Sequence, residues 1–299
     1  MAFTAKDVAA LRDKTGCGMM DCKKALTESD GDMDKAIDFL RERGLAAAQK
    51  KASRIAAEGV VVTKSNGKSV VILEVNAESD FVAKNEKFTS FVDTVADTIL
   101  AESPADVDAL AECKAVGTDM TVAELLREKI LVIGENIKIR RFVKYDGAVC
   151  GYTHAGSRIA VITRYNTEAT SEEIAAAAKT ICMHITMYKP DYIAKEDVPA
   201  EIVDHEREVL KAQAMAEGKP EAIAEKMVMG RINKFYKENC LNEQGYIMDE
   251  DISVAKYLDN VSKELGKKVA VEAYTRFEVG EGLEKREDNF AEEVAKMMG

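Results

Sequence analysis

The chain has 299 residues, of which 46% are hydrophobic and 32% charged, and this length and composition fit several domains with buried cores better than one. Its formal net charge of -11 would repel a phosphate backbone, and no long Lys/Arg block offers a local exception, so we expect protein partners and no direct nucleic-acid binding. No stretch approaches the roughly 20 consecutive apolar residues that a membrane span requires, so we expect no membrane association.

The six cysteines are scattered along the chain, without the short paired spacing that a zinc site needs. Their number and spacing do not suggest a disulfide framework, so we expect reduced and mostly buried thiols, with no metal and no cofactor. Residues 1–7 contain no apolar segment typical of a signal peptide, and an acidic residue comes early. These features favour a cytoplasmic location.

The first 55 residues are predicted to form a small helical domain followed by a helical linker. The apolar spacing and the glycines predict helices over about 4–15, 19–26 and 32–43, with Gly44 ending the third. The Ala-rich, cationic stretch 45–57 has good helix propensity but little to bury, so we interpret it as the linker.

Residues 56–140 are predicted to form a first α+β subdomain. The β-branched runs 60–63 and 69–75 flank Asn66-Gly67, which is the strongest short signal for a β-hairpin. A polar and aromatic segment follows at 79–82, and helices are predicted over about 85–101 and 121–133.

Residues 141–280 repeat this theme, which predicts a second, related α+β subdomain. Three strands are expected over 137–144, 148–154 and 159–165, followed by a helix over 171–188. After the hairpin described next, a helix over 253–265 and a strand over 268–279 complete the subdomain. The last segment, 281–299, is predicted to be a C-terminal module with an acidic helix near 290–298.

A helical hairpin is predicted within the second subdomain, at about residues 190–238. Two strongly helical stretches, about 200–217 and 221–238, are separated by Gly218-Lys219-Pro220. The sparse apolar residues predict a narrow coiled-coil seam with Ile202, Val209, Ala212 and Ala216 on one arm and Ile223, Met227 and Gly230 on the other. The hairpin could pair with its own copy, so a homodimer through it is left open.

A conventional active site is hard to assemble from this sequence. None of the phosphate-loop, dinucleotide-binding or nucleophile-elbow patterns occurs, and His205 lies among charged residues. This argues weakly against an enzyme, because an active site built from distant carboxylates leaves no linear trace. An enzyme of that kind and a non-catalytic adaptor both stay open as alternatives.

Five segments, in order along the chain, resemble the elongation factor Ts family. They are TGCGMMDCKKAL at 15–26, SDFVAK at 79–84, GENIKIRR at 134–141, IAEKMV at 223–228 and RFEVGEG at 276–282. The resemblance implies an α+β fold with an N-terminal three-helix ubiquitin-associated-like domain, a core of two α+β subdomains with antiparallel sheets, an inserted coiled-coil hairpin and a C-terminal helical module. It also implies an exchange factor that binds elongation factor Tu in its GDP-bound and nucleotide-free states.

The resemblance further implies that Ser79, Asp80, Phe81 and Val82 form the segment that disturbs the magnesium site of the partner GTPase. Phe81 would insert between partner helices, and Asp80 would act on the magnesium field. From the residues alone, Asp80 could instead be a helix N-cap and Phe81 a core residue of the helix that follows.

Three further residues are implied to contact the partner: Arg12, Met19 and Met20 on one face of the N-terminal domain. Core packing of a small helical domain is the alternative for the two methionines. His154 is implied to contact the partner near the phosphate side of the nucleotide. Its alternative is a histidine at a strand end, and an extra residue in the turn after it could shift its register.

Overall fold

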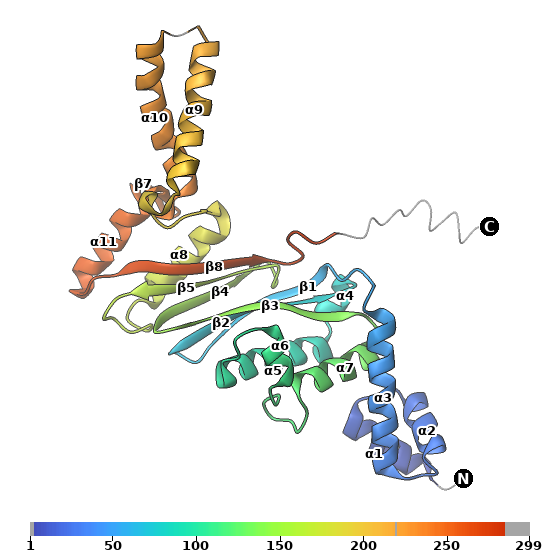
Figure 1. Cartoon of the computed structure of the whole chain (residues 1–299). Coiled ribbons are helices and arrows are strands. Elements are labelled where there is room, and N and C mark those ends of the chain that lie inside the picture. Colours follow the sequence, from blue (N-terminus) through green and yellow to red (C-terminus); the bar gives the residue numbers. More distant parts are fainter. Residues whose placement is uncertain (1–2, 219, 285–299) are drawn as a thin grey trace. The chain divides into compact units, whose positions relative to one another are not determined.

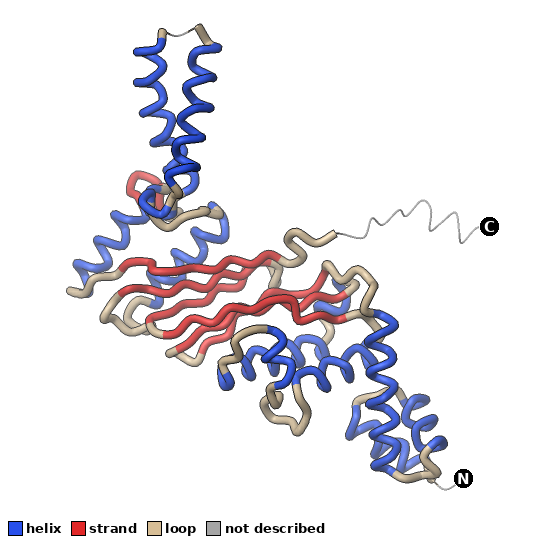
Figure 2. Tube along the Cα trace, viewed as in Figure 1, coloured by secondary structure: helices blue, strands red, loops and turns tan. Residues whose placement is uncertain are grey.

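The computed structural model describes residues 3–218 and 220–284. Over these residues the chain is a mixed fold of helices and antiparallel sheets, which confirms the α+β class (Figures 1 and 2). It divides into two compact units. The first contains residues 3–62, 73–143 and 277–284, and the second contains residues 63–72 and 144–276.

Three helices form the N-terminal part of the first unit: α1 (Ala5–Thr15), α2 (Met19–Glu28) and α3 (Met33–Lys51). A capping box between Thr4 and Asp7 starts α1, and the Asp32 side chain accepts two backbone N–H groups at the start of α3. The helices enclose their own small core, which includes the fully buried residues Leu11, Cys22 and Leu26.

The prediction that Gly44 ends the third helix is wrong, because α3 continues for seven more residues to Lys51. Glycine inside a helix costs about 1 kcal/mol relative to alanine, so its presence calls for a packing reason. Helices α3 and α7 (Val122–Ile133) pack together, and a Cβ on Gly44 would lie 3.3 Å from the Arg127 carbonyl oxygen. Gly44 therefore permits a close approach of the two helices instead of ending one of them.

The predicted hairpin is present as β1 (Glu58–Ser65) and β2 (Ser69–Ala77), and β3 (Ile137–Asp146) completes a sheet of order β1-β2-β3. Asn66 accepts backbone N–H groups of Lys68 and Ser69 in the turn, while Gly67 adopts a φ of 85°.

The segment between β2 and β3 is helical. It contains α4 (Asp80–Ala83), α5 (Glu86–Glu102), α6 (Val107–Glu112) and α7. Helices α5 and α7 pack against each other, and α5 buries Phe88 and Phe91. A capping box formed by Thr121 and Glu124 starts α7. The sequence did not predict α6 as a separate helix.

The second unit contains a sheet of order β4-β5-β8, formed by β4 (Ala148–His154), β5 (Ile159–Asn166) and β8 (Ala270–Glu278). Strands β4 and β5 are antiparallel, with Cα partners running from Ala148 opposite Tyr165 to His154 opposite Ile159. Helices α8 (Ala175–Tyr188) and α11 (Val254–Leu265) share a core with this sheet that includes Val161, Ile181 and Leu258. A short pair, β6 (Gly245–Tyr246) and β7 (Asp249–Ser253), precedes α11.

The predicted helical hairpin is also present, as α9 (Ala200–Ala216) and α10 (Glu221–Asn239), which lie side by side in Figure 1. Its predicted seam is wrong, because Ile202, Val209 and Ile223 are exposed. The buried positions are Val203, Leu210, Ala214, Val228 and Ile232. Both stripes of α9 have the seven-residue spacing of a coiled coil, so the spacing alone could not choose between them.

Among the described residues, no helix is long and apolar enough to cross a membrane. In the same part of the chain, no group of three or more His, Cys, Asp or Glu side chains could hold a metal ion. The predicted acidic helix near 290–298, and most of the predicted C-terminal module, lie outside the described residues.

Candidate functional site

The segment 79–82 lies in the first unit, where β2 ends and the four-residue helix α4 begins. Ser79 is the N-cap residue of α4 and Asp80 is its first helical residue, so the alternative that Asp80 is the N-cap is wrong. The side chain of Phe81 is 81% exposed, whereas Val82 beside it is only 8% exposed. The alternative that Phe81 is a core residue is therefore wrong too.

Phe81 is the most exposed large hydrophobic residue in the described part of the chain, and burial of its ring against another surface would contribute on the order of 1.5 to 3 kcal/mol. Val82 anchors the helix to the unit, while Phe81 on the same helix projects into solvent. This arrangement presents an apolar ring to a partner without requiring the segment to unfold. Phe81 therefore has the exposure that a docking residue needs.

Asp80 carries a solvent-accessible carboxylate next to this ring. Its only ion pair within the described residues is with Lys84, at 3.8 Å, and both side chains are more than half exposed. An exposed pair of this kind contributes at most about 1 kcal/mol, so a stronger partner could readily displace it. The Asp80 carboxylate is therefore accessible to groups outside the protein.

Two carboxylates fix the backbone immediately before α4. Ser79 donates from its backbone N–H to Glu135 Oε2 at 3.0 Å and from its hydroxyl to Glu135 Oε1 at 2.6 Å. In return, the backbone N–H of Asn136 donates to Glu78 Oε1 at 2.6 Å. Arg54 pairs with Glu78 at 3.3 Å. The sequence did not predict a role for Glu78 or Glu135, because each carboxylate and the backbone group it binds are more than 50 residues apart.

Met19 and Met20 occupy the first two positions of α2 and are 56% and 73% exposed, so the alternative of core packing for them is wrong. Arg12 is exposed on α1. The Lys87 ammonium group at the start of α5 donates to the carbonyl oxygen of Gly16, between α1 and α2, at 3.2 Å. This bond links the loop that precedes the two methionines to the helix that follows Phe81.

His154 is the last residue of β4 and belongs to the second unit. It is half-buried, and its Nδ1 lies 2.9 Å from the hydroxyl of Tyr152. The turn after it contains three consecutive residues with positive φ, at 155–157. The first unit thus contains Arg12, Met19, Met20 and the segment 79–82, but not His154.

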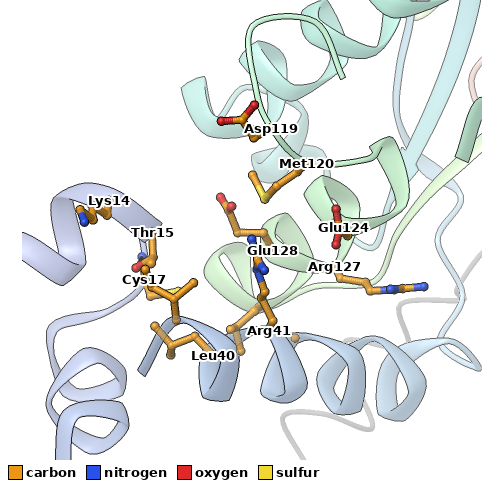
Figure 3. A pocket seen from close by; sticks show the side chains of 13 residues that line it. Lys14, Thr15, Cys17, Leu40, Arg41, Asp119, Met120, Glu124, Arg127 and Glu128 are labelled. Carbon is orange, nitrogen blue, oxygen red and sulfur yellow. Dashed lines mark hydrogen bonds between the residues drawn. The ribbon is translucent and has the colours of Figure 1, made fainter. Parts of the chain in front are cut away.

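A pocket of about 380 Å³ lies in the first unit between the N-terminal helices and α7, and the sequence did not predict it (Figure 3). Arg41 of α3 and Glu128 of α7 extend into the space between the two helices, while the Arg127 side chain points away. The lining carries charges of both signs, and Gly44 forms part of it.

Comparisons with known proteins identify a family that the chain resembles along its length. A family model described as "Elongation factor TS" matches residues 78–281 of the chain. The chain is 48% identical over 301 residues to "Elongation factor Ts" of Syntrophotalea carbinolica, with 99% of each chain covered. It is 50% identical over 302 residues to the protein of that name from Clostridium perfringens strain 13, again with 99% of each covered. The protein of that name from Trichlorobacter lovleyi is 46% identical over 309 residues.

Proposed function

Because the chain belongs to the elongation factor Ts family, we propose that it is the guanine nucleotide exchange factor for elongation factor Tu in translation elongation. In this proposal it binds the GDP-bound GTPase, disturbs the magnesium site and promotes release of GDP, so that GTP can bind. It makes and breaks no covalent bond.

Nucleotide exchange couples two binding equilibria of the GTPase, one with the nucleotide and one with the exchange factor. A factor that binds the nucleotide-free GTPase more tightly than the loaded one weakens nucleotide binding, and nucleotide weakens the binding of the factor to the same degree. A coupling factor of about a thousand requires roughly 4 kcal/mol of differential binding. Burial of the Phe81 ring against the GTPase would supply on the order of 1.5 to 3 kcal/mol of it.

The observation that carries this proposal is the 81% exposure of Phe81 on a helix anchored by the buried Val82. In the proposed complex Phe81 inserts between helices of the GTPase and moves them. Asp80 approaches the ligands of the magnesium ion, which is the largest local charge in that site. Ser79 and Val82 hold the two active side chains in place.

The other residues have supporting roles in the proposal. Arg12, Met19 and Met20 contact the GTPase from the N-terminal domain, whose three helices with their own small core suit a ubiquitin-associated-like module. His154 contacts the partner near the phosphate side of the nucleotide. We place the domain limits at 1–55, 56–140, 141–280 and 281–299, with the hairpin inserted in the third. A cytoplasmic location, the absence of nucleic-acid binding and a homodimer through the hairpin stay predictions.

The test is the dissociation rate of fluorescent GDP from elongation factor Tu, measured with and without this protein. We expect dissociation to accelerate with protein concentration and to reach a plateau. An adaptor would bind the GTPase without changing the dissociation rate, and that result would refute the exchange function.

A further inference from the structure

Two short segments of the first unit bind each other through a reciprocal exchange of side-chain and backbone groups. Glu135 accepts the backbone N–H and the hydroxyl of Ser79, while Glu78 accepts the backbone N–H of Asn136 at 2.6 Å. We call these four residues the carboxylate clamp. It connects the end of β2 to the start of β3.

The clamp is partly shielded from solvent, because Asn136 is buried and Glu78, Ser79 and Glu135 are half-buried. Asn136 is 8% exposed, and its side-chain amide donates to the Arg54 carbonyl oxygen at 2.8 Å. The Glu78 side chain is 18% exposed. Hydrogen bonds to an ionised carboxylate are roughly twice as strong as neutral ones, so the two bonds from Ser79 to Glu135 favour one position of the Ser79 backbone.

Ser79 uses its hydroxyl in an uncommon way for an N-cap residue. A serine at this position usually accepts a backbone N–H of the first helical turn. Within the described α4, Ser79 makes no such capping bond, and its hydroxyl donates to Glu135 instead. The Ser79 hydroxyl therefore attaches the start of α4 to Glu135 instead of capping the helix.

Helix α4 depends on such external contacts. An isolated helix of four residues is unstable, because the first hydrogen-bonded turn carries a nucleation cost that only later turns offset. The contacts that fix it include the buried Val82 within its length, packing against α5 on its C-terminal side and the clamp at its N-terminal end. Loss of the clamp would let the Phe81 ring move relative to the rest of the unit.

We propose that Glu135 is a positioning residue for nucleotide exchange, acting through Ser79 to hold the direction in which Phe81 projects. This inference rests on the proposed exchange function. Glu135 itself touches neither the nucleotide nor the magnesium ion in this account. Its effect appears in the maximal rate of GDP release and not mainly in the affinity of the factor for the GTPase.

The experiment measures GDP release from elongation factor Tu at saturating concentrations of each variant. Glu135→Ala is expected to lower the maximal rate roughly 10- to 100-fold, since small misplacements of an acting group have effects of that size. Glu135→Gln keeps one acceptor oxygen and should fall between Ala and wild type. Ser79→Ala removes only the hydrogen bond from the Ser79 hydroxyl to Glu135. This variant replaces Glu135→Ala in the experiment if Glu135→Ala folds poorly. Glu112→Ala, at an exposed site on α6, is the matched control and should release GDP at the wild-type rate.

Two further readouts separate positioning from a general structural role. In a Phe81→Ala background, Glu135→Ala should cause no additional loss of rate, because the group that it positions is gone. Because the chain contains no tryptophan, Phe81→Trp provides a single tryptophan at the site, whose fluorescence can be excited selectively over that of the tyrosines. Its steady-state anisotropy in the free protein should fall when Glu135→Ala is added and stay unchanged with Glu112→Ala.

Several results would overturn the inference. If Phe81→Ala slows release but Glu135→Ala and Ser79→Ala do not, the inference is wrong and the exchange function stands. If the losses from Phe81→Ala and Glu135→Ala add fully, Glu135 is a structural residue and does not position Phe81. If Phe81→Ala releases GDP like wild type, the role proposed for Phe81 fails, and the inference fails with it.

Discussion

The backbone N–H of Gly280 donates to the buried carboxylate of Glu74 at a distance of 2.9 Å. Arg140 and Arg141 of β3 bind the same carboxylate at 2.9 and 2.6 Å. The guanidinium of Arg141 also stacks over the Phe277 ring, 4.0 Å from its centre. These contacts attach the turn that follows β8 to the middle of β2 and β3. Glu74 is therefore a structural centre of the first unit.

We expect Glu74→Ala to lower the free energy of unfolding by about 3 kcal/mol, because it leaves two guanidinium groups without their buried partner. Urea denaturation followed by circular dichroism measures this change. Glu281→Ala is the matched control. It removes an acid that pairs with Arg141 at 3.2 Å but is half exposed, so a loss below about 1 kcal/mol is expected. Equal losses for the two variants would contradict the central role of Glu74.

The Glu74 carboxylate should also make the free energy of unfolding depend on pH in the acidic range. Burial raises the pKa of Glu74, but hydrogen bonds from Gly280, Arg141, Arg140 and Asn76 outweigh it and hold the pKa below its ordinary value of 4.5. Since the folded pKa is lowered, the stabilisation is fully present above pH 4.5 and disappears as the pH falls through the folded value. Unfolding free energies measured between about pH 6 and pH 3 should fall less steeply for Glu74→Gln than for wild type. Identical slopes would contradict the prediction.

Two glycines of the turn after β8 test how much the close packing of this turn contributes to the free energy of unfolding. Gly280 and Gly282 have φ angles of 71° and 72°, so alanine is strained at either position. A Cβ at Gly280 would also lie 2.3 Å from the Ala57 carbonyl oxygen, whereas none of the described atoms lies within 4 Å at Gly282. We expect Gly282→Ala to lower the unfolding free energy by about 1 kcal/mol and Gly280→Ala by clearly more. Similar losses would mean that the close approach to Ala57 has no energetic weight.

The exposed methionines of α2 test the proposed partner face. Met20 is 73% exposed, so Met20→Ala should leave the unfolding free energy within about 0.5 kcal/mol of wild type. If Met20 is buried against elongation factor Tu, the affinity for the nucleotide-free GTPase should fall roughly tenfold. Met248→Ala, at a 68% exposed position of the second unit, controls for loss of any surface methionine. The affinities are measured by titration calorimetry. If the two substitutions change the affinity equally, Met20 does not lie in the interface.

Much of the fold follows from local signals in the sequence. Asn66-Gly67 located the β1–β2 turn, because Gly67 readily adopts a positive φ and the Asn66 side chain accepts backbone N–H groups within the turn. Gly44 misled the prediction, since a glycine that ends a helix and one that admits a neighbouring helix look alike in sequence. The seam of the hairpin was misplaced for a similar reason, because two apolar stripes with the same spacing lie one residue apart on α9.

The candidate site was located in sequence by its resemblance to one family, but its geometry was not predictable. Nothing local distinguishes an exposed Phe81 from a buried one, because exposure depends on what packs around α4. The binding of Ser79 by Glu135 joins positions 56 residues apart, and no periodicity connects them. The resemblance thus identified the segment, and the structure supplied the exposure and the contacts that position it.

The most direct test of the exchange function is the GDP dissociation rate from elongation factor Tu at saturating Phe81→Ala or Asp80→Ala. Both side chains are exposed, so the variants should fold like wild type. We predict a maximal rate about 10- to 100-fold lower for Phe81→Ala, which corresponds to the loss of 1.5 to 3 kcal/mol of burial, and a smaller decrease for Asp80→Ala. Dissociation at the wild-type rate with both variants would contradict the account.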